Sequence, residues 1–275
     1  MLSQRGFLQV GSSRLEYAWY GPGPSEAPTI VFLHEGLGCV TLWKDFPERV
    51  AAATGLGALV YSRAGYGGSS PVNVPRSLRY MHEEGLEVLP EVLDAAGIRQ
   101  ALLVGHSDGA SISVIHAGSA DDRRLAGIVL MAPHVFNEPQ CVDSIRRARE
   151  AYQDTPLRER LARYHGENVD CAFWGWNQAW LDPGFRRWNI EEYLPGIRVP
   201  VLVIQGLQDE YGTSDQVEAI ERQSGARVET LWLDDCRHSP HRDRPEATLE
   251  AIREAALAWT KESHPAADAG GQVES

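Results

Sequence analysis

Short apolar runs alternate with longer amphipathic segments along most of this chain. Continuous apolar runs are typical of strands buried on both faces, and the segments between them have helical spacing. The runs at 29–33, 58–61, 101–104, 125–131, 199–204 and 228–233 predict strands. Helices are predicted at 43–54, 81–96, 110–115, 214–223 and 245–259, and a hairpin joins 7–10 to 15–20. Strands that alternate with helices predict an α/β fold with a mostly parallel central sheet and helices on both faces.

This alternation stops after Met131 and resumes at Val199. Residues 133–193 contain no strand-like run, but they include charged helical segments at 144–153 and 156–164 and a group of tryptophans. We predict a helical cap at 133–193, inserted into a core made of 1–132 and 194–262. The cap is expected over the carboxyl ends of the strands, where open α/β sheets bind ligands. The polar, glycine-containing tail 263–275 is predicted to be disordered.

Composition narrows the partners of the chain. A formal net charge of −12 over 275 residues argues against nucleic acid and against an anionic membrane surface. Residues 1–10 show no signal-peptide pattern, and no apolar stretch approaches the roughly 20 residues that span a bilayer. The four scattered cysteines predict neither a zinc site nor a disulfide framework. A cytoplasmic protein with reduced thiols is expected. The oligomeric state is left open, a homodimer included.

The pentapeptide Gly105–Gly109, Gly-His-Ser-Asp-Gly, carries the strongest chemical signal. It lies between a strand-like run and a helix-like run, the context in which a nucleophilic serine projects from a sharp turn. The two glycines remove the Cβ atoms that would collide in so tight a bend. Ser107 is therefore the candidate nucleophile, and a glycine-rich turn without catalytic function is the alternative.

A serine hydroxyl needs an adjacent base, and the base needs an orienting carboxylate. In this type of turn the chain order is serine, acid, histidine. Asp209 directly follows the strand predicted at 199–204, and His238 lies in the loop before the last helix. We predict Asp209 as the acid and His238 as the base. Glu210, Asp234 and Asp235 are the competing acids, and His241 is the competing base.

The tetrahedral intermediate of acyl transfer needs backbone N–H donors. One donor is predicted at Asp108, the residue after the nucleophile. The second is predicted at Gly36, with Leu37 as its alternative, in the loop after the strand 29–33. Glu35 and Asp108 then place two carboxylates near a developing anion, which would oppose catalysis if they were unpaired. We expect Arg63 or another cation to neutralise at least one of them, with both side chains directed away from the oxyanion.

Together these motifs resemble the α/β-hydrolase superfamily. The resemblance rests on His34–Gly38, Ser62–Gly67, Gly105–Gly109, Asp209 and His238 and extends over roughly residues 5 to 260. It implies a triad of Ser107, His238 and Asp209, no cofactor, and activity on esters, lactones, amides or carbon–carbon bonds of small molecules. Two positions depart from the usual pattern. Glu35 replaces a common glycine, and Asp108 replaces an apolar residue or glutamine.

The predicted pocket lies where cap and core meet. Its candidate residues are His34, Glu35, Leu37, His134, Phe136, Trp174, Trp176 and Trp180. The tryptophans could instead form the core of the cap, His34 could brace its turn by hydrogen bonds, and His106 is expected beside the sheet. We expect a small-molecule substrate with an apolar or aromatic portion.

The chain is therefore predicted to be a serine hydrolase that cleaves a carboxylic ester or a lactone through an acyl-enzyme. One alternative is a hydrolase of carbon–carbon bonds in ring-cleavage diketones. Others are a cofactor-free lyase, synthase or acyltransferase on the same triad, and a ligand-binding module without catalysis. A haloalkane dehalogenase is disfavoured, because its nucleophile would be an aspartate at position 107.

Overall fold

The computed structural model describes residues 2–119 and 122–262. Eight strands form one sheet in the order β1-β2-β4-β3-β5-β6-β7-β8, and all of its pairs are parallel except β1–β2 and β2–β4. The strands are β1 Leu2–Val10, β2 Ser13–Tyr20, β3 Thr29–Leu33, β4 Gly57–Tyr61, β5 Ala101–His106, β6 Leu125–Met131, β7 Val201–Gly206 and β8 Val228–Leu233. The predicted α/β class and parallel sheet are confirmed.

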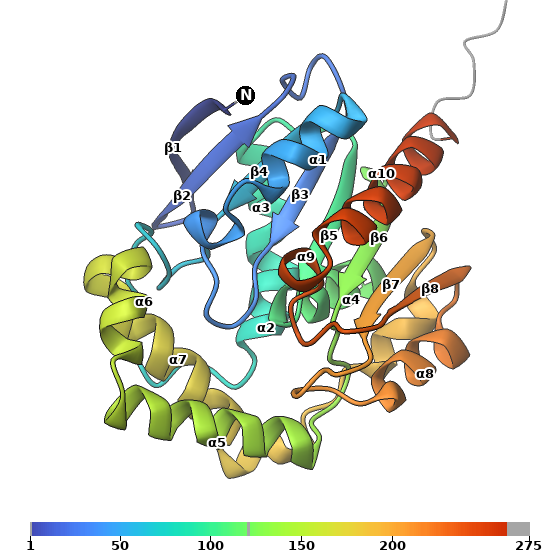
Figure 1. The fold of residues 1–275 in the computed structure, drawn as a ribbon. Helices are drawn as coiled ribbons and strands as arrows, with labels where there is room; N and C mark the ends of the chain where they lie inside the picture. The colour runs from blue at the N-terminus through green and yellow to red at the C-terminus, as the bar shows by residue number, and fades with distance from the viewer. Residues whose placement is uncertain (1, 120–121, 263–275) are drawn as a thin grey trace, which may run out of the picture.

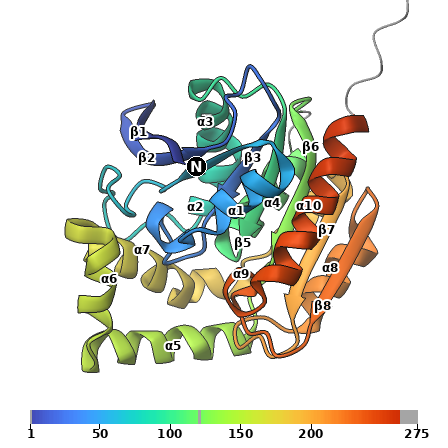
Figure 2. The same ribbon diagram turned by 45° about the horizontal axis from the view of Figure 1, so that its top comes forward.

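Helices cover both faces of this sheet (Figures 1 and 2). One face carries α1 Phe46–Thr54 and α10 Pro245–Glu262 with the short α9 Pro240–Asp243, and the other carries α3 Leu89–Ala95, α4 Asp108–Ser119 and α8 Ser214–Gln223. Alternate residues of one strand enter different cores: Ile30 and Phe32 pack with α1, whereas Val31 and Leu33 pack toward α3 and α4. This two-sided burial explains why the strands were continuous apolar runs.

Two predicted helices are divided in the structure. A 3₁₀ turn, η1 Val40–Trp43, precedes α1 and ends where Lys44 adopts a positive φ of 55°, so the helix begins at Phe46 rather than at Trp43. The segment predicted as one helix at 81–96 consists of α2 Tyr80–Glu83, a π-helical turn η2 Glu84–Val88, and α3. The π-helical turn ends just before Pro90. Because Pro90 has no N–H, it cannot donate a regular helical hydrogen bond to the preceding turn.

The segment between β6 and β7 is helical. It contains α5 Pro139–Asp154, α6 Leu157–His165, α7 Val169–Leu181 and the 3₁₀ turns η3 Gly166–Asn168, η4 Pro183–Arg187 and η5 Glu191–Gly196. In both views α5, α6 and α7 lie together beyond one end of the sheet (Figures 1 and 2). That 133–193 forms a separate cap domain stays a prediction, and the predicted disordered tail at 263–275 lies outside the described residues.

Two further expectations can be compared with the described residues. All four cysteines are free, as the absence of a disulfide framework requires. Within 2–119 and 122–262, none of the helices combines the length and apolar character that crossing a bilayer needs.

Candidate active site

Ser107 occupies a strained turn between β5 and α4. Its φ is +52°, which L-residues rarely adopt, and its N–H donates to the carbonyl of Met131 at 2.9 Å. A Cβ on Gly105 would lie under 3.0 Å from backbone atoms of Gly109. A Cβ on Gly109 would lie under 3.0 Å from backbone atoms of Leu33. The two glycines are therefore required by close backbone approach, as the sequence predicted. The surrounding structure holds the strained serine in place, a common feature of functional sites.

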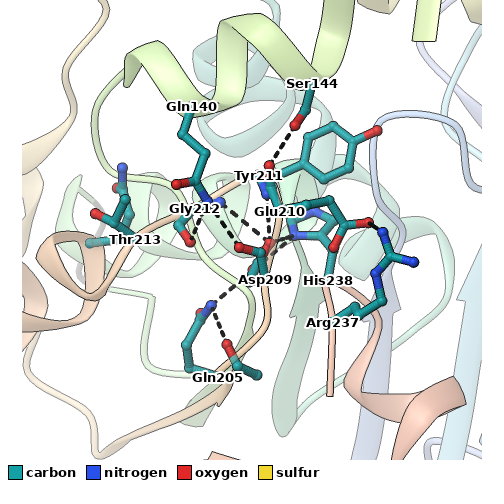
Figure 3. A network of polar contacts seen from close by, with 12 residues as sticks. Gln140, Ser144, Gln205, Asp209, Glu210, Tyr211, Gly212, Thr213, Arg237 and His238 are labelled. Carbon is teal, nitrogen blue, oxygen red and sulfur yellow. Dashed lines mark hydrogen bonds and ion pairs between the residues drawn. The ribbon is translucent and has the colours of Figure 1, made fainter. Parts of the chain in front are cut away.

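Asp209 and His238 form a direct pair (Figure 3). Nδ1 of His238 lies 2.9 and 3.0 Å from the two carboxylate oxygens of Asp209. The same carboxylate accepts the backbone N–H of Tyr211 at 2.8 Å and of Gly212 at 3.3 Å, and the side-chain amide of Gln205 at 2.8 Å. Because the carboxylate is fully engaged, its orientation toward the imidazole is well determined.

The contact between Asp209 and His238 shifts the pKa values of both side chains. Burial by itself would raise the pKa of Asp209, but the charge and hydrogen bond of His238 hold that pKa far below its usual range. Burial by itself would lower the pKa of His238, but Asp209, and more weakly Glu210 and Glu35, raise it above 6.5. His238 is thus a stronger base than a free imidazole.

The competing residues do not occupy equivalent positions. His241 packs its ring 4.7 Å from Trp43 and 5.7 Å from Phe46, and burial lowers its pKa well below 6.5. Glu210 makes an ion pair with Arg237 at 3.3 Å. The structure therefore pairs the predicted acid with the predicted base rather than with their neighbours.

A cavity joins these groups. Its lining combines the turn at Ser107, the loop after β3, the loops after β6, β7 and β8, and helices α5 and α7. The residues are Glu35, Gly36, Leu37, His106, Ser107, Asp108, His134, Cys141, Ile145, Trp176, Trp180, Glu210, Tyr211, His238 and Ser239. Ser107 and His238 thus line the same cavity, at the carboxyl ends of the strands, as expected for a ligand site in an open α/β sheet.

Three predicted pocket residues do not line this cavity. The ring of His34 accepts the backbone N–H of Arg63 at 3.1 Å through Nε2, and its Nδ1 lies 2.7 Å from the carbonyl of Glu35, so it links its own loop to the loop after β4. Phe136 makes an isolated bridge with Asn189. Trp174 packs against Tyr152 and the neighbouring Phe173.

Helical spacing explains which tryptophans of α7 line the cavity. Trp176 and Trp180 are four residues apart on α7 and share the face that lines the cavity, whereas Trp174 lies on another face of the same helix. This spacing was visible in the sequence, but α7 was not predicted as a helix. His106 is buried as expected and also contributes to the cavity wall.

The predicted oxyanion donors have suitable surroundings. The N–H of Asp108 belongs to the first turn of α4, where helix N–H groups have no partner within the helix. The guanidinium of Arg63 donates to the carbonyls of His34 at 2.5 Å and of Glu35 at 3.2 Å. Because the carbonyl and the N–H of a trans peptide point to opposite sides, the N–H of Gly36 points away from Arg63.

The Asp108 carboxylate is enclosed by donors. Oδ2 accepts the hydroxyl of Tyr80 at 2.5 Å, Oδ1 accepts the indole N–H of Trp180 at 3.3 Å, and Arg63 lies 3.8 Å away. Burial raises the pKa of this carboxyl, against the opposing influence of Arg63 and the two hydrogen bonds. The expectation of a cation beside at least one carboxylate is met, and Tyr80 is a supporting residue that the sequence reasoning missed.

Glu35 has looser partners. Its carboxylate lies 3.4 Å from Arg242 and 3.5 Å from Nδ1 of His106. Burial would raise the pKa of Glu35, yet His106, Arg242 and His241 together hold it well below its usual range. The carboxylate is therefore ionised at the wall of the cavity. Among the described residues, no cluster of histidine, cysteine and carboxylate side chains could hold a metal ion.

Comparison with known proteins identifies the family of this chain. The family model described as "Alpha/beta hydrolase family" matches residues 30–251, which include Ser107, Asp209 and His238. The chain belongs to the α/β-hydrolase family. Epoxide hydrolase B of Mycobacterium tuberculosis is 32% identical over 124 residues, 44% of this chain and 33% of that protein. This α/β hydrolase therefore matches only a third of that relative's length.

Two solved structures share the fold of this α/β hydrolase. The 2-hydroxy-6-oxo-6-phenylhexa-2,4-dienoate hydrolase of Rhodococcus sp. strain RHA1 has a TM-score of 0.75 and 17% identity, with 93% of this chain and 99% of that chain covered. The enol-lactonase of Burkholderia xenovorans LB400 has a TM-score of 0.69 and 21% identity, with 91% and 99% covered. At these identities the likeness concerns the fold.

Proposed function

We propose that this α/β hydrolase is a serine hydrolase that cleaves a small-molecule carboxylic ester or lactone through an acyl-enzyme. The observation that carries the proposal is the Asp209–His238 pair, at 2.9 and 3.0 Å, in a cavity that also exposes Ser107 from its strained turn. A nucleophile, a base and an orienting carboxylate at one cavity are the parts that acyl transfer requires.

In the proposed reaction, Ser107 Oγ attacks the substrate carbonyl while Nε2 of His238 takes the hydroxyl proton. The Nδ1–H of His238 stays hydrogen-bonded to the carboxylate of Asp209, which stabilises the imidazolium that forms. The oxyanion accepts the N–H groups of Asp108 and Gly36. Collapse of the tetrahedral intermediate expels the alkoxide, which takes the proton from His238. Water, deprotonated by the same imidazole, then releases the carboxylic acid and regenerates Ser107.

The cavity holds a second potential nucleophile, the thiol of Cys141. Burial, followed by the charges of Asp108 and Glu138, raises the pKa of this thiol well above its usual value. A thiol without thiolate character is a weak nucleophile. This supports the assignment of the nucleophile to Ser107.

The apolar part of the lining supports an apolar or aromatic substrate group. Leu37, Ile145, Trp176, Trp180 and Tyr211 contribute to the wall of the cavity. Aromatic walls contribute large apolar area and prefer flat partners. We therefore expect p-nitrophenyl phenylacetate to be turned over with a higher kcat/KM than p-nitrophenyl methoxyacetate. Equal kcat/KM values would contradict this preference.

The test is a substrate panel of p-nitrophenyl esters, lactones, a ring-cleavage diketone and an epoxide, assayed with the wild type and with Ser107→Ala. Loss of turnover should be on the order of 10³-fold or more, and a fluorophosphonate probe should label only the protein that retains Ser107. The matched control is Ser119→Ala, which removes a hydroxyl from an exposed residue at the end of α4, the helix that follows Ser107. Turnover of the diketone alone would favour the carbon–carbon hydrolase, and Ser107→Ala activity equal to the wild type would contradict the proposal.

A further inference from the structure

Apart from the histidines, the charged side chains at the wall of the cavity share one sign. Glu35, Asp108 and Glu210 line it, and neither lysine nor arginine is among its lining residues in the described part of the chain. The remaining titratable members are the imidazoles of His106, His134 and His238, the phenol of Tyr211 and the thiol of Cys141. A wall with this composition has a negative electrostatic potential unless nearby cations neutralise its carboxylates.

Compensation is incomplete. Each carboxylate has an arginine, but the separations are 3.4 Å for Glu35–Arg242, 3.8 Å for Asp108–Arg63 and 3.3 Å for Glu210–Arg237. Surface pairs of the same protein are tighter, at 2.7 Å for Arg49–Glu246 and 2.5 Å for Arg253–Glu250.

Among the lining residues of the cavity the carboxylates are present and their three arginine partners are not, so each pair has its negative member nearer to the cavity. Each pair is therefore a dipole with its negative end at the cavity wall. An oriented dipole of this kind favours positive charge in the cavity and disfavours negative charge.

Two of the three side chains keep solvent-exposed area. The Asp108 oxygens are occupied by Tyr80 and Trp180, and the side chain is 1% exposed. The side chains of Glu35 and Glu210 are 18% and 33% exposed. A cation in the cavity would therefore interact chiefly with Glu35 and Glu210.

The other faces of the cavity suit the same kind of group. The indoles of Trp176 and Trp180 and the ring of Tyr211 belong to the lining. Aromatic faces attract organic cations through their quadrupoles, and this attraction strengthens where water is excluded. His134 is 1% exposed and lies between the rings of Trp180 and His238. Burial and the neighbouring His238 lower its pKa to about 3, so this imidazole stays neutral and does not repel a cation.

From this one-sided charge and the aromatic wall we infer that the cavity selects a substrate that carries an organic ammonium group and rejects one that carries a carboxylate. The inference rests on the proposed ester hydrolysis at Ser107 and names the substrate class of that site. It also separates the candidate reactions, since a ring-cleavage dienoate is an anion and would meet Glu35 and Glu210 without a lysine or arginine in the described lining.

The test uses three p-nitrophenyl esters with the same three-carbon spacer: 4-(trimethylammonio)butanoate, its neutral isostere 5,5-dimethylhexanoate, and the glutarate half-ester. In the wild type, kcat/KM for the ammonium ester should exceed that for the neutral ester by roughly tenfold, and the half-ester should fall roughly tenfold below it. Both ratios should shrink at high salt, because ions screen the carboxylates.

Variants assign the effect to the cavity. In Glu35→Gln/Glu210→Gln the ammonium-to-neutral ratio should approach one. The control Glu250→Gln removes a carboxylate from an exposed arginine pair on α10 and should leave the ratio at its wild-type value. Three results would each overturn the inference. The first is a kcat/KM for the ammonium ester no higher than that for the neutral ester, and the second is a kcat/KM for the half-ester equal to that for the neutral ester. The third is an unchanged ammonium-to-neutral ratio in the double variant.

Binding separates this inference from the proposed function. Dissociation constants of the three esters with Ser107→Ala, measured by calorimetry, should rank in the same order as kcat/KM. If Ser107→Ala turned over esters like the wild type, the proposed function would fail, and the kcat/KM ratios of the three esters would still decide the charge selectivity.

Discussion

Gly36→Ala is expected to disturb the loop after β3, which carries the proposed oxyanion donor Gly36, through a collision with α7. A Cβ on Gly36 would stand under 3.0 Å from both Nε1 and Cδ1 of Trp176, a distance that real Cβ atoms essentially never show. The φ of Gly36 is not in the left-handed region, so backbone preference does not forbid the substitution. Its cost therefore arises from the indole of Trp176, which is 6% exposed.

The size of the effect follows from which group moves. If the buried indole moves, we expect an overpacking cost of about 1–3 kcal/mol in the free energy of unfolding. If the loop moves instead, the N–H of Gly36 leaves its position, and a displacement of about 1 Å costs on the order of 10²-fold in rate. Both responses lower kcat/KM, because Gly36 and Trp176 line the same cavity.

The assay is a double-mutant cycle of Gly36→Ala and Trp176→Leu, read by urea unfolding and by kcat/KM on a neutral p-nitrophenyl ester. Because the smaller side chain removes the collision, the double variant should lose less than the sum of the single variants, with a coupling of roughly 0.5–3 kcal/mol. The control is Gly68→Ala, whose Cβ would meet only the Glu16 carboxyl at an ordinary 3.5 Å.

The reasoning would be refuted by a Gly36→Ala protein whose unfolding free energy lies within about 0.5 kcal/mol of the wild type and whose kcat/KM is unchanged. It would also be refuted if the two substitutions were additive, since additivity would mean that the loop and the indole do not constrain each other.

Three further predictions follow from the contacts. The kcat/KM of the wild type should fall as the pH drops through the pKa of His238, which lies above 6.5, because only the neutral imidazole accepts a proton. Asp209→Asn should move this acid limb to lower pH and reduce kcat by about 10⁴-fold, and an unmoved limb in the pH–rate profile would contradict the assignment. Gly109→Ala should destabilise the fold by about 3 kcal/mol or more in urea unfolding, because its Cβ would meet a backbone carbonyl; a stable, active variant would disprove this. Tyr80→Phe should cost roughly 1.5–3 kcal/mol, because it removes a hydrogen bond to the buried Asp108 carboxylate, and a change below 0.5 kcal/mol would argue against that bond.

The local sequence was sufficient to predict the turn that presents Ser107. The strand before it, the helix after it and the two flanking glycines all act within a few residues, so their geometry follows from spacing and sterics. Asp209 and His238 were predictable for a related reason. Each lies in the loop after a strand, and the carboxyl ends of neighbouring parallel strands meet at one edge of a sheet.

The electrostatics of the site were decided by tertiary structure. From the sequence we expected Arg63 or another cation to neutralise at least one of Glu35 and Asp108, but the sequence did not assign a partner to each carboxylate. Folding brings Arg63 and Tyr80 to Asp108 and brings Arg242 to Glu35 across 207 positions. Such partners come from different elements, so no periodicity within one segment reveals them.

The wall of the cavity was decided in the same way. Trp176 and Trp180 face the cavity and Trp174 does not, because the packing of α7 determines which helical face points inward. By itself, the sequence determined the turn that presents Ser107 and the chain order of Ser107, Asp209 and His238, since these depend on local spacing. Only the tertiary structure determined which charges and rings surround Ser107, because that depends on contacts between distant segments.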